Sequence, residues 1–219
     1  MKNRKYLLRL VFILTLAFFA SQFHLSVHGQ SIEDRVLEKL DLKEGMIVAD
    51  LGAGNGKFSV KIARIVGLEG HVYANEIDKD EIRKIKNSIE DQGIENITII
   101  HGEEEDAVLP VKVDFMVLKY VYHHLDSPDN FMTNLLKYMN PGGRLAVIAV
   151  DINHVSSKRA NKEYRDACVS DPEKTKQAIE KSGYQFEKRE DVKTPKNVEY
   201  ILIFKASEKE KETPPLFLN

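Results

Sequence analysis

The chain has 219 residues, of which 42% are apolar and 30% charged, so it is long enough to bury one substantial core. Its formal net charge of −2 excludes the basic field that is typical of nucleic-acid-binding proteins. A single cysteine, Cys168, excludes a disulfide framework and a metal site built from cysteines.

The first 29 residues differ in composition from the rest of the chain. Basic residues within positions 2–9 precede an apolar run at 10–20, which is shorter than the ~18 residues expected of a membrane span. A basic head and a short apolar segment are typical of a secretory signal peptide, and we expect cleavage after Gly29. The alternative is an uncleaved membrane anchor. Either segment predicts that the folded domain is exported or membrane-anchored, and a cytoplasmic location is the remaining alternative.

From Ser31, whose side chain can cap a helix, helical and strand patterns alternate along the chain. The predicted helices lie within residues 32–40, 58–66, 82–89, 128–139 and 173–182. The predicted strands are residues 46–51, 71–76, 97–101, 113–119, 145–150, 184–190 and 199–205. Pro141, Gly142 and Gly143 are expected to end the fourth helix and to turn the chain into the strand at 145.

The strands at 46–51, 113–119 and 145–150 are apolar throughout, as expected of strands that helices cover on both faces. The last two strands alternate more and predict an antiparallel hairpin at one edge. We therefore expect an α/β fold with a doubly wound, mostly parallel sheet. The expected domain covers residues 30–206 and is followed by a charged, disordered tail at 207–219.

Residues 48–57, VADLGAGNGK, join a buried strand to the start of a helix. Gly52, Gly54 and Gly56 alternate in this loop, and glycine permits positive φ angles and lets a ligand lie directly against the main chain. Asp50 ends the strand, where its carboxylate can accept hydrogen bonds from a cationic ligand. The loop is therefore the first candidate binding site.

Further candidates follow the other predicted strands, at the edge where ligands bind in open α/β sheets. Glu76 ends the second strand about 20 residues after the glycine loop, the separation at which an acid accepts from ribose hydroxyls. Glu103 and Glu104 follow the third strand, where they can meet an adenine amino group. The last candidates are Lys119, Tyr120, His123 and His124, at and after the end of the fourth strand.

Two kinds of cofactor would place a ribose beside Glu76, namely a nicotinamide dinucleotide and a nucleoside without phosphate. The spacing of the glycines distinguishes between these two cofactors. A dinucleotide site has the pattern G-x-G-x-x-G, whereas the third glycine of this chain comes one residue earlier. Asp50 would also repel a pyrophosphate. A cofactor with a sulfonium, an ammonium and no phosphate, S-adenosylmethionine, suits the acid better.

Five segments carry a resemblance to a known family, namely residues 48–56, 73–78, 101–106, 114–125 and 141–145. In order and spacing they resemble the class I S-adenosylmethionine-dependent methyltransferases, in particular the group that includes the ubiquinone/menaquinone biosynthesis methyltransferases. The resemblance implies a seven-stranded sheet in the order 3-2-1-4-5-7-6 with the seventh strand antiparallel. It covers most of the chain after residue 30.

The same resemblance implies that S-adenosyl-L-methionine is the cofactor. The glycine loop would hold its methionine part, the acid of the second strand its ribose, and the loop after the third strand its adenine. Glu103 departs from the family, in which aspartate is common at this position. The residues assigned to the cofactor are Asp50, Gly52, Ala53, Gly54, Gly56, Glu76, Ile77, Glu103, Glu104 and Lys119.

The expected activity is methyl transfer to an unidentified, small-molecule acceptor. His123 or His124 is the candidate catalytic base, because histidine accepts a proton near neutral pH. The alternative is that these histidines pack against the next helix, since methyl transfer to a good nucleophile needs mainly alignment. For the basic residues within 158–165 we consider two roles: they bind an anionic acceptor, or they form the solvated face of a helix.

Other functions remain open at this point. They are an exported, non-catalytic S-adenosylmethionine-binding module, an enzyme that modifies proteins, and an NAD-dependent oxidoreductase. We expect no metal and no nucleic-acid partner, and membrane contact only through an uncleaved N-terminal segment.

Overall fold

The computed structural model describes residues 30–155 and 168–207. The predicted signal peptide or anchor at 1–29, the basic residues within 158–165 and the predicted tail from 208 onward lie outside the described residues. Among the helices of the described ranges, none is long and apolar enough to cross a membrane.

The described strands form one sheet in the order β3-β2-β1-β4-β5-β8-β7, and a short β6 pairs with β5 beside this path. Neighbours from β3 to β5 run parallel, whereas β8 is antiparallel to β5 and β7. The strands are β1 Ile47–Leu51, β2 His71–Glu76, β3 Ile97–His101, β4 Val113–Lys119, β5 Met139–Asp151, β6 Val169–Ser170, β7 Tyr184–Lys193 and β8 Val198–Ala206. The predicted order is confirmed. The two-residue β6 is too short to leave a sequence pattern, and it shifts the numbers of the last two strands.

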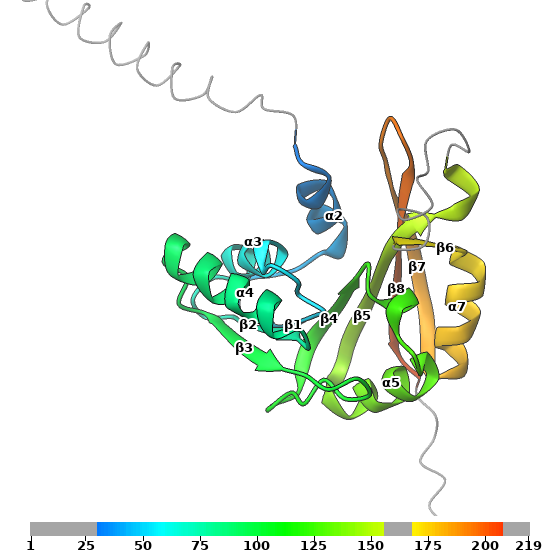
Figure 1. Cartoon of the computed structure of the whole chain (residues 1–219). Coiled ribbons are helices and arrows are strands. Elements are labelled where there is room, and N and C mark those ends of the chain that lie inside the picture. The colour runs from blue at the N-terminus through cyan, green and yellow to red at the C-terminus, as the bar shows by residue number, and fades with distance from the viewer. Residues whose placement is uncertain (1–29, 156–167, 208–219) are drawn as a thin grey trace, which may run out of the picture.

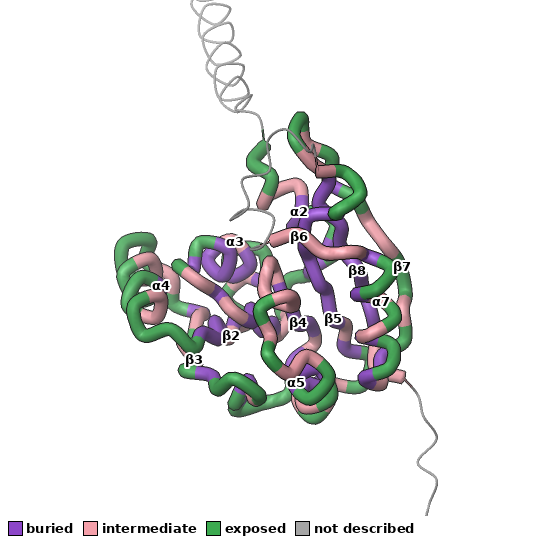
Figure 2. Tube along the Cα trace, turned by 45° about the vertical axis from the view of Figure 1, so that its right-hand side comes forward, coloured by how far each residue is buried: buried purple, intermediate pink, exposed green. Residues whose placement is uncertain are grey.

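Helices cover both faces of the sheet (Figure 1). The α-helices are α2 Ile32–Leu40, α3 Lys57–Val66, α4 Lys79–Gln92, α5 Pro128–Leu135 and α7 Pro172–Lys181, and short 3-10 helices occur at η1 Tyr122–His124, η2 Leu136–Tyr138 and η3 Ile152–His154. Val36 of α2 and Ile62 of α3 pack on one face, while Met132 of α5 and Ile179 of α7 pack on the other. Figure 2 shows the central strands β4, β5 and β8 as the buried part of the fold and α4 as largely exposed.

The predicted helix at 128–139 ends earlier than expected. The α-helix stops at Leu135, the next turn is the 3-10 helix η2, and Met139 already belongs to β5. The apolar stripe continues through this tighter turn, so its periodicity did not reveal the end of the α-helix.

The Pro-Gly-Gly segment lies inside β5 instead of preceding it. β4 and β5 pair Val113 with Met139 and then Phe115 with Arg144, so residues 140–143 bulge opposite one residue, Asp114. The Asp114 carboxylate accepts hydrogen bonds from the Asn140 side chain at 2.8 Å and from a backbone amide of β1 at 2.9 Å. This polar anchor holds the irregular start of the strand in the sheet.

Ser31 caps helix α2, as the sequence predicts, and the structure adds a reciprocal hydrogen bond that makes the cap a capping box. The Ser31 side chain accepts a hydrogen bond from the Asp34 amide, and the Asp34 carboxylate accepts one from the Ser31 amide. Glu33, in the same helical turn, pairs with Lys61 of α3 at 3.1 Å and with Lys119 at the end of β4 at 3.4 Å. These contacts hold α2 over the carboxyl edge of the sheet.

Replacing the cap tests how far it stabilises α2. Ser31→Ala removes the oxygen that accepts from Asp34, so we expect the free energy of unfolding to fall by about 1 kcal/mol in urea denaturation. Ser31→Thr keeps a hydroxyl and is expected to keep most of this stability. Equal losses in both variants would contradict the role of the cap.

Candidate functional site

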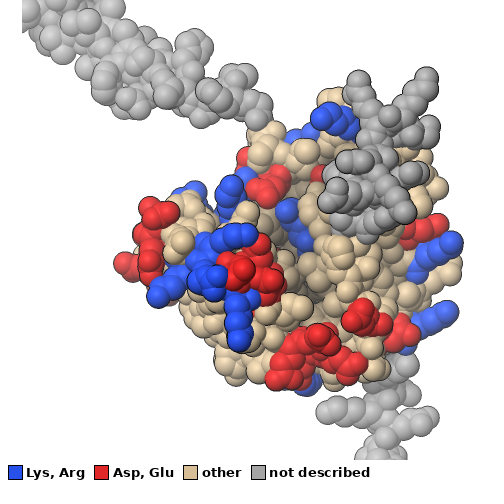
Figure 3. All heavy atoms as spheres, in the orientation of Figure 1, with Lys and Arg blue, Asp and Glu red and all other residues tan. Residues whose placement is uncertain are grey.

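A cavity of about 290 Å³ opens at the carboxyl edge of β1, β2 and β4. Its walls come from the glycine loop, from the loops after β2 and β3, and from the segment after β4. The lining residues are Gly52, Asn75, Glu76, Ile77, Glu103, Glu104, Tyr120, Val121, His124, Leu125 and Phe131. In Figure 3 this face of the molecule is hollowed near its middle, with acidic side chains gathered below the hollow.

The cavity brings together part of the predicted cofactor set. Gly52, Glu76, Ile77, Glu103 and Glu104 line it, and so does one candidate base, His124. The remaining predicted residues lie outside its lining, and these are Asp50, Ala53, Gly54, Gly56, Lys119 and His123.

The glycine loop adopts the backbone that its composition predicts. Gly52, Gly54 and Gly56 have φ angles of 70°, 54° and 76°, values that other residues rarely adopt. The amides of Gly52 and Ala53 both donate to the carbonyl of Asn75 at 2.9 Å. The loop after β1 is therefore fixed to the end of β2.

Two of these glycines are also required by close packing. A Cβ atom at Gly52 would lie 2.4 Å from Cγ2 of Val121, and one at Gly56 would lie 3.1 Å from the Cα atom of Ile85. A Cβ atom at Gly54 would meet no atom within 4 Å. Gly52 thus lets the segment after β4 approach the loop, and Gly56 lets α4 approach the start of α3.

Glu76 connects the glycine loop to the start of the next segment. Its Oε2 accepts a hydrogen bond from the Gly54 amide at 2.8 Å, and its Oε1 accepts from the amides of Ile77 and Asp78 at 2.8 and 3.0 Å. A carboxylate accepts about four hydrogen bonds, so capacity for a ligand hydroxyl remains. The side chain lies at the cavity wall and is 8% exposed, as a ribose-binding acid requires.

Asp50 is buried behind this loop. Its Oδ2 accepts a hydrogen bond from the Ser59 hydroxyl of α3 at 2.6 Å, and the residue is 2% exposed. Burial raises the pKa of Asp50 to about 6, although the Ser59 hydroxyl and the charge of Lys119 act in the opposite direction. Ionisation of Asp50 is therefore more costly than that of an exposed aspartate, and a nearby cation would favour its charged form.

Lys119, at the end of β4, stands between several groups of opposite charge. Its Nζ lies 3.4 Å from Glu33 of α2 and within 5.1 Å of the ring centroid of Phe58 and 4.7 Å of that of Tyr120. The positive charge of Lys119 lowers the pKa of both Asp50 and Glu33. Lys119 therefore balances the acids at this edge.

The two histidines occupy different positions. They belong to the 3-10 helix η1, with ring centroids 4.1 Å apart, and only His124 lines the cavity. Of the two candidate bases, only His124 lies at the cavity wall.

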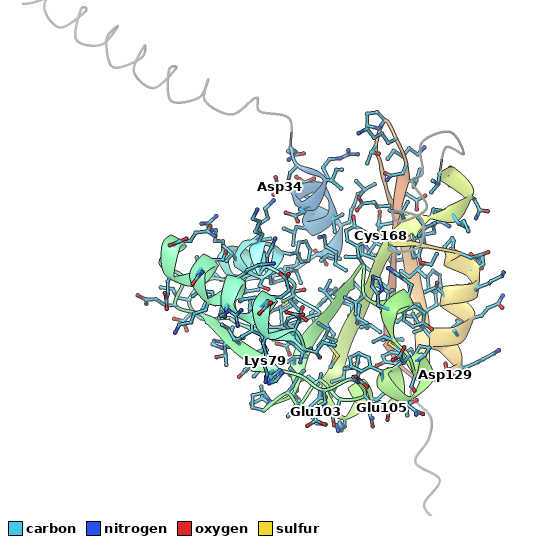
Figure 4. The ribbon with its side chains drawn as sticks, in the orientation of Figure 1. Asp34, Lys79, Glu103, Glu105, Asp129 and Cys168 are labelled. Atoms are coloured by element: carbon cyan, nitrogen blue, oxygen red, sulfur yellow. The ribbon has the colours of Figure 1, made fainter. Side chains whose placement is uncertain are left out.

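The acidic residues that follow β3 have two different surroundings. Glu103 and Glu104 are exposed at the cavity rim, whereas Asp106 accepts hydrogen bonds from the Tyr138 hydroxyl at 2.7 Å and from the Val108 amide at 2.9 Å. Figure 4 shows Glu103 along the loop that follows β3. Asp106 holds the loop, and within the described residues no group of acids, histidines and cysteines forms a metal site.

Several lining residues were missed by sequence reasoning. Asn75 is 4% exposed, and its side chain donates to the carbonyl of Ala107 at 2.8 Å, which ties the loop after β3 to β2. Tyr120 has a φ of 61°, which is rare for a non-glycine residue. Tyr120 was a candidate by its place after the fourth strand, but nothing in the sequence predicted its backbone conformation. Asn75, directly before Glu76, offered a weak signal as a polar residue in a buried strand, whereas no local pattern distinguishes Val121, Leu125 or Phe131.

Comparison with known proteins gives three results. A family model described as a methyltransferase domain matches residues 42–205. The chain is 28% identical over 108 residues to the ubiquinone/menaquinone biosynthesis C-methyltransferase UbiE of Vibrio vulnificus, a match that covers 48% of this chain and 42% of that one. It is 28% identical over 127 residues to a probable cobalt-precorrin-6B C(15)-methyltransferase (decarboxylating) of Sulfurisphaera tokodaii, covering 58% and 65% of the two chains.

The solved structures agree with this fold. The crystal structure of a SAM-dependent methyltransferase from Aquifex aeolicus superposes with a TM-score of 0.67 at 24% identity and covers 78% of this chain and 88% of that one. The matches to the two curated relatives span less than two thirds of the length of either relative.

Sheet order, glycine loop and strand-end acid together define the class I methyltransferase fold. Because the family model covers residues 42–205, the chain belongs to the methyltransferase-domain family. The family and the fold imply S-adenosyl-L-methionine as the cofactor. The resemblance found in the sequence is confirmed.

A substitution in the glycine loop tests its packing. Gly52→Ala places a Cβ atom 2.4 Å from Val121, so we expect a loss of about 2–4 kcal/mol in the free energy of unfolding. Gly142→Ala, at a similar φ of 77° but with no atom within 4 Å, is expected to lose only about 1–2 kcal/mol. Adding Val121→Ala to Gly52→Ala should recover part of the loss, and strictly additive effects in thermal unfolding would contradict the contact.

The raised pKa of Asp50 predicts a pH-dependent cost to stability. Between about pH 4 and pH 6 the folded protein retains a proton at Asp50 that the unfolded chain releases, so stability falls as the pH rises through this range. Asp50→Asn removes the buried charge, and we expect it to raise the free energy of unfolding by about 2–3 kcal/mol at pH 8. In urea denaturation at pH 4, Asp50→Asn should change the free energy of unfolding little. An equal gain in stability at pH 4 and pH 8 would contradict the raised pKa of Asp50.

Proposed function

We propose that the chain is an S-adenosylmethionine-dependent methyltransferase that acts on a small-molecule acceptor. The observation that carries the proposal is the Glu76 carboxylate, which lies at the cavity wall while its Oε2 accepts from the Gly54 amide of the glycine loop. The remaining capacity of this carboxylate suits a ribose hydroxyl next to an open stretch of main chain.

The other lining residues fit the rest of the cofactor. The main chain around Gly52, where no side chain intervenes, is suited to the methionine part. Ile77 is 53% exposed although it is apolar, and an adenine ring placed on it would cover this surface. Glu103 and Glu104 lie at the rim on the same side, where a carboxylate or a backbone group meets an adenine amino group.

The charges at the site favour a cationic ligand over a dinucleotide. Asp50 and Glu76 flank the glycine loop, and two carboxylates would repel a pyrophosphate. The ammonium and the sulfonium of S-adenosylmethionine would instead offset the negative charges of Asp50 and Glu76. The site therefore supports S-adenosylmethionine and disfavours the NAD-dependent alternative.

S-adenosylmethionine supplies, when bound, a methyl group on a positively charged sulfur that an acceptor atom attacks. The chain contributes position, because the loop after β1 and the segment after β4 both line the cavity and would hold the cofactor and the acceptor together. His124 is available at the wall to take a proton from an acceptor with an O–H or N–H group. An acceptor atom that is already a good nucleophile needs no base and only has to be aligned with the methyl group.

The N-terminal sequence supports a second candidate function. The basic and apolar residues within positions 2–20 favour export or membrane attachment, which would bring the domain into surroundings poor in S-adenosylmethionine. An exported, non-catalytic S-adenosylmethionine-binding module would have the same cofactor residues. Turnover of S-adenosylmethionine to S-adenosylhomocysteine distinguishes the two.

The cofactor assignment is tested by calorimetric titration of the purified chain. We expect micromolar-range affinity for S-adenosylmethionine, and Asp50→Ala or Glu76→Ala should weaken it by about tenfold or more. Glu90→Ala, an exposed acid on α4, is the matched control and should leave the affinity unchanged. Unchanged binding in both site variants, or tight binding of NAD, would overturn the proposal.

A further inference from the structure

Glu199 is a buried acid that the cofactor assignment does not use. It is the second residue of β8 and pairs with Val150 of β5 and Val192 of β7. Because β8 runs antiparallel to β5, the start of β8 lies at the carboxyl edge of the parallel strands. Glu199 is 3% exposed and therefore stands at the ligand-binding edge without contact with solvent.

The two oxygens of Glu199 differ in their surroundings. A hydrogen bond from Tyr120 reaches the carboxylate, whereas Oε2 has no hydrogen-bond partner within the part of the chain that the structure describes. A buried acceptor without a donor is costly, and most such atoms in folded proteins are paired. The stability of the fold gives no reason for a carboxylate here.

Charged groups on several elements surround this carboxylate. Lys119 of β4 and Arg35 of α2 attract its negative charge and Glu33 of α2 repels it, while burial raises the pKa of Glu199. The negative charge of Glu199 also contributes to a raised pKa of the Cys168 thiol, which is labelled in Figure 4 beside β6. The carboxylate is thus only partly compensated by the protein itself.

Tyr120 links Glu199 to the cofactor cavity. It lines the cavity, donates to Glu199, and has the left-handed φ of 61° that places its backbone outside the usual range of a tyrosine. Its amide donates to the carbonyl of Ile148 in β5 at 2.9 Å, which fixes this conformation. An uncommon backbone conformation at the end of a strand is typical of a functional position.

The arrangement separates two ends of the binding edge. The proposed cofactor residues belong to β1, β2 and the loop after β3, whereas Glu199 lies beyond β4 and β5 on β8. Lys119 stands between them and acts on the pKa of both Asp50 and Glu199. Glu199 is not itself among the residues that line the cavity, but Tyr120 lines the cavity and is hydrogen-bonded to Glu199, so a molecule that enters beside Tyr120 approaches this carboxylate.

We propose that Glu199 binds the methyl acceptor, and that it selects acceptors carrying an ammonium group or a comparable N–H donor. The inference rests on the proposed methyltransferase function. The Oε2 atom receives the donor, and Tyr120 holds the carboxylate in place through its other hydrogen bond. An anionic acceptor is disfavoured because it would bring a second negative charge beside the buried Glu199 carboxylate, whose Oε2 has no donor within the described residues.

The test uses three probes that differ in one group, namely benzylamine, benzyl alcohol and benzoate, titrated into the full chain saturated with S-adenosylhomocysteine. Ligand-observed NMR should show benzylamine binding at least about tenfold more tightly than benzoate. Glu199→Gln should weaken benzylamine by about tenfold while S-adenosylmethionine affinity stays within about twofold. Glu187→Gln, an exposed acid on β7, is the matched control and should bind like the unaltered chain.

Structural and functional roles of Glu199 give different results. Because Glu199→Gln removes a buried charge, its thermal stability should equal or exceed that of the unaltered chain. If this variant does not fold, Glu199→Asp withdraws the carboxylate by one methylene and should weaken benzylamine by about threefold or more.

The inference is overturned by unchanged benzylamine binding in these variants, by preferential binding of benzoate, or by loss of S-adenosylmethionine binding in Glu199→Gln. Failure of the unaltered chain to bind S-adenosylmethionine would instead refute the proposed function. In that case the same benzylamine titration without cofactor still decides the role of Glu199.

Discussion

The hydrogen bonds between the end of β2 and the glycine loop are the interactions on which the rest of the site depends. The Asn75 carbonyl accepts from Gly52 and Ala53, and the Glu76 carboxylate accepts from Gly54. Two neighbouring strands are thereby joined beyond the point where their own pairing ends. Because these hydrogen bonds fix the conformation of the glycine loop, no side chain is needed for that purpose, and the main chain remains accessible to a ligand.

A second constraint is the balance of charge along the carboxyl edge. Lys119 is the positive group shared by Asp50, Glu33 and Glu199, which come from three different elements. Burial of Asp50 and Glu199 raises the pKa of each, and their neighbours compensate them incompletely. Such a site gains most from a ligand that brings positive charge to it, which is consistent with the proposed cofactor at one end and the proposed amine at the other.

The sequence predicted those parts of the fold that depend on local pattern. Continuous apolar runs located the central strands, and the alternating glycines located the loop, because both follow from backbone requirements within a few residues. The bulge opposite Asp114 was not predicted, since it depends on pairing with β4, and the helix before it was taken to be too long. Glu76 was found as a strand-end acid, whereas its hydrogen bond to Gly54 is a tertiary contact.

The features that the sequence did not reveal share one property, which is that they depend on segments distant in sequence. Glu199 looks like an ordinary acid in an alternating strand, and only the antiparallel return of β8 brings it to the binding edge. Tyr120 carries no local sign of its positive φ. Asp50 was expected to face a ligand directly, and the structure shows it bonded to Ser59 behind the loop.

The contact between Gly52 and Val121 has a consequence for how this family diverges. A side chain at position 52 is excluded by the size of the residue at position 121, 69 positions further along the chain. The order of change is therefore constrained: the later residue must shrink before the earlier one can enlarge. Even then the positive φ of Gly52 opposes a side chain, so a smaller residue at position 121 removes only one of the two obstacles.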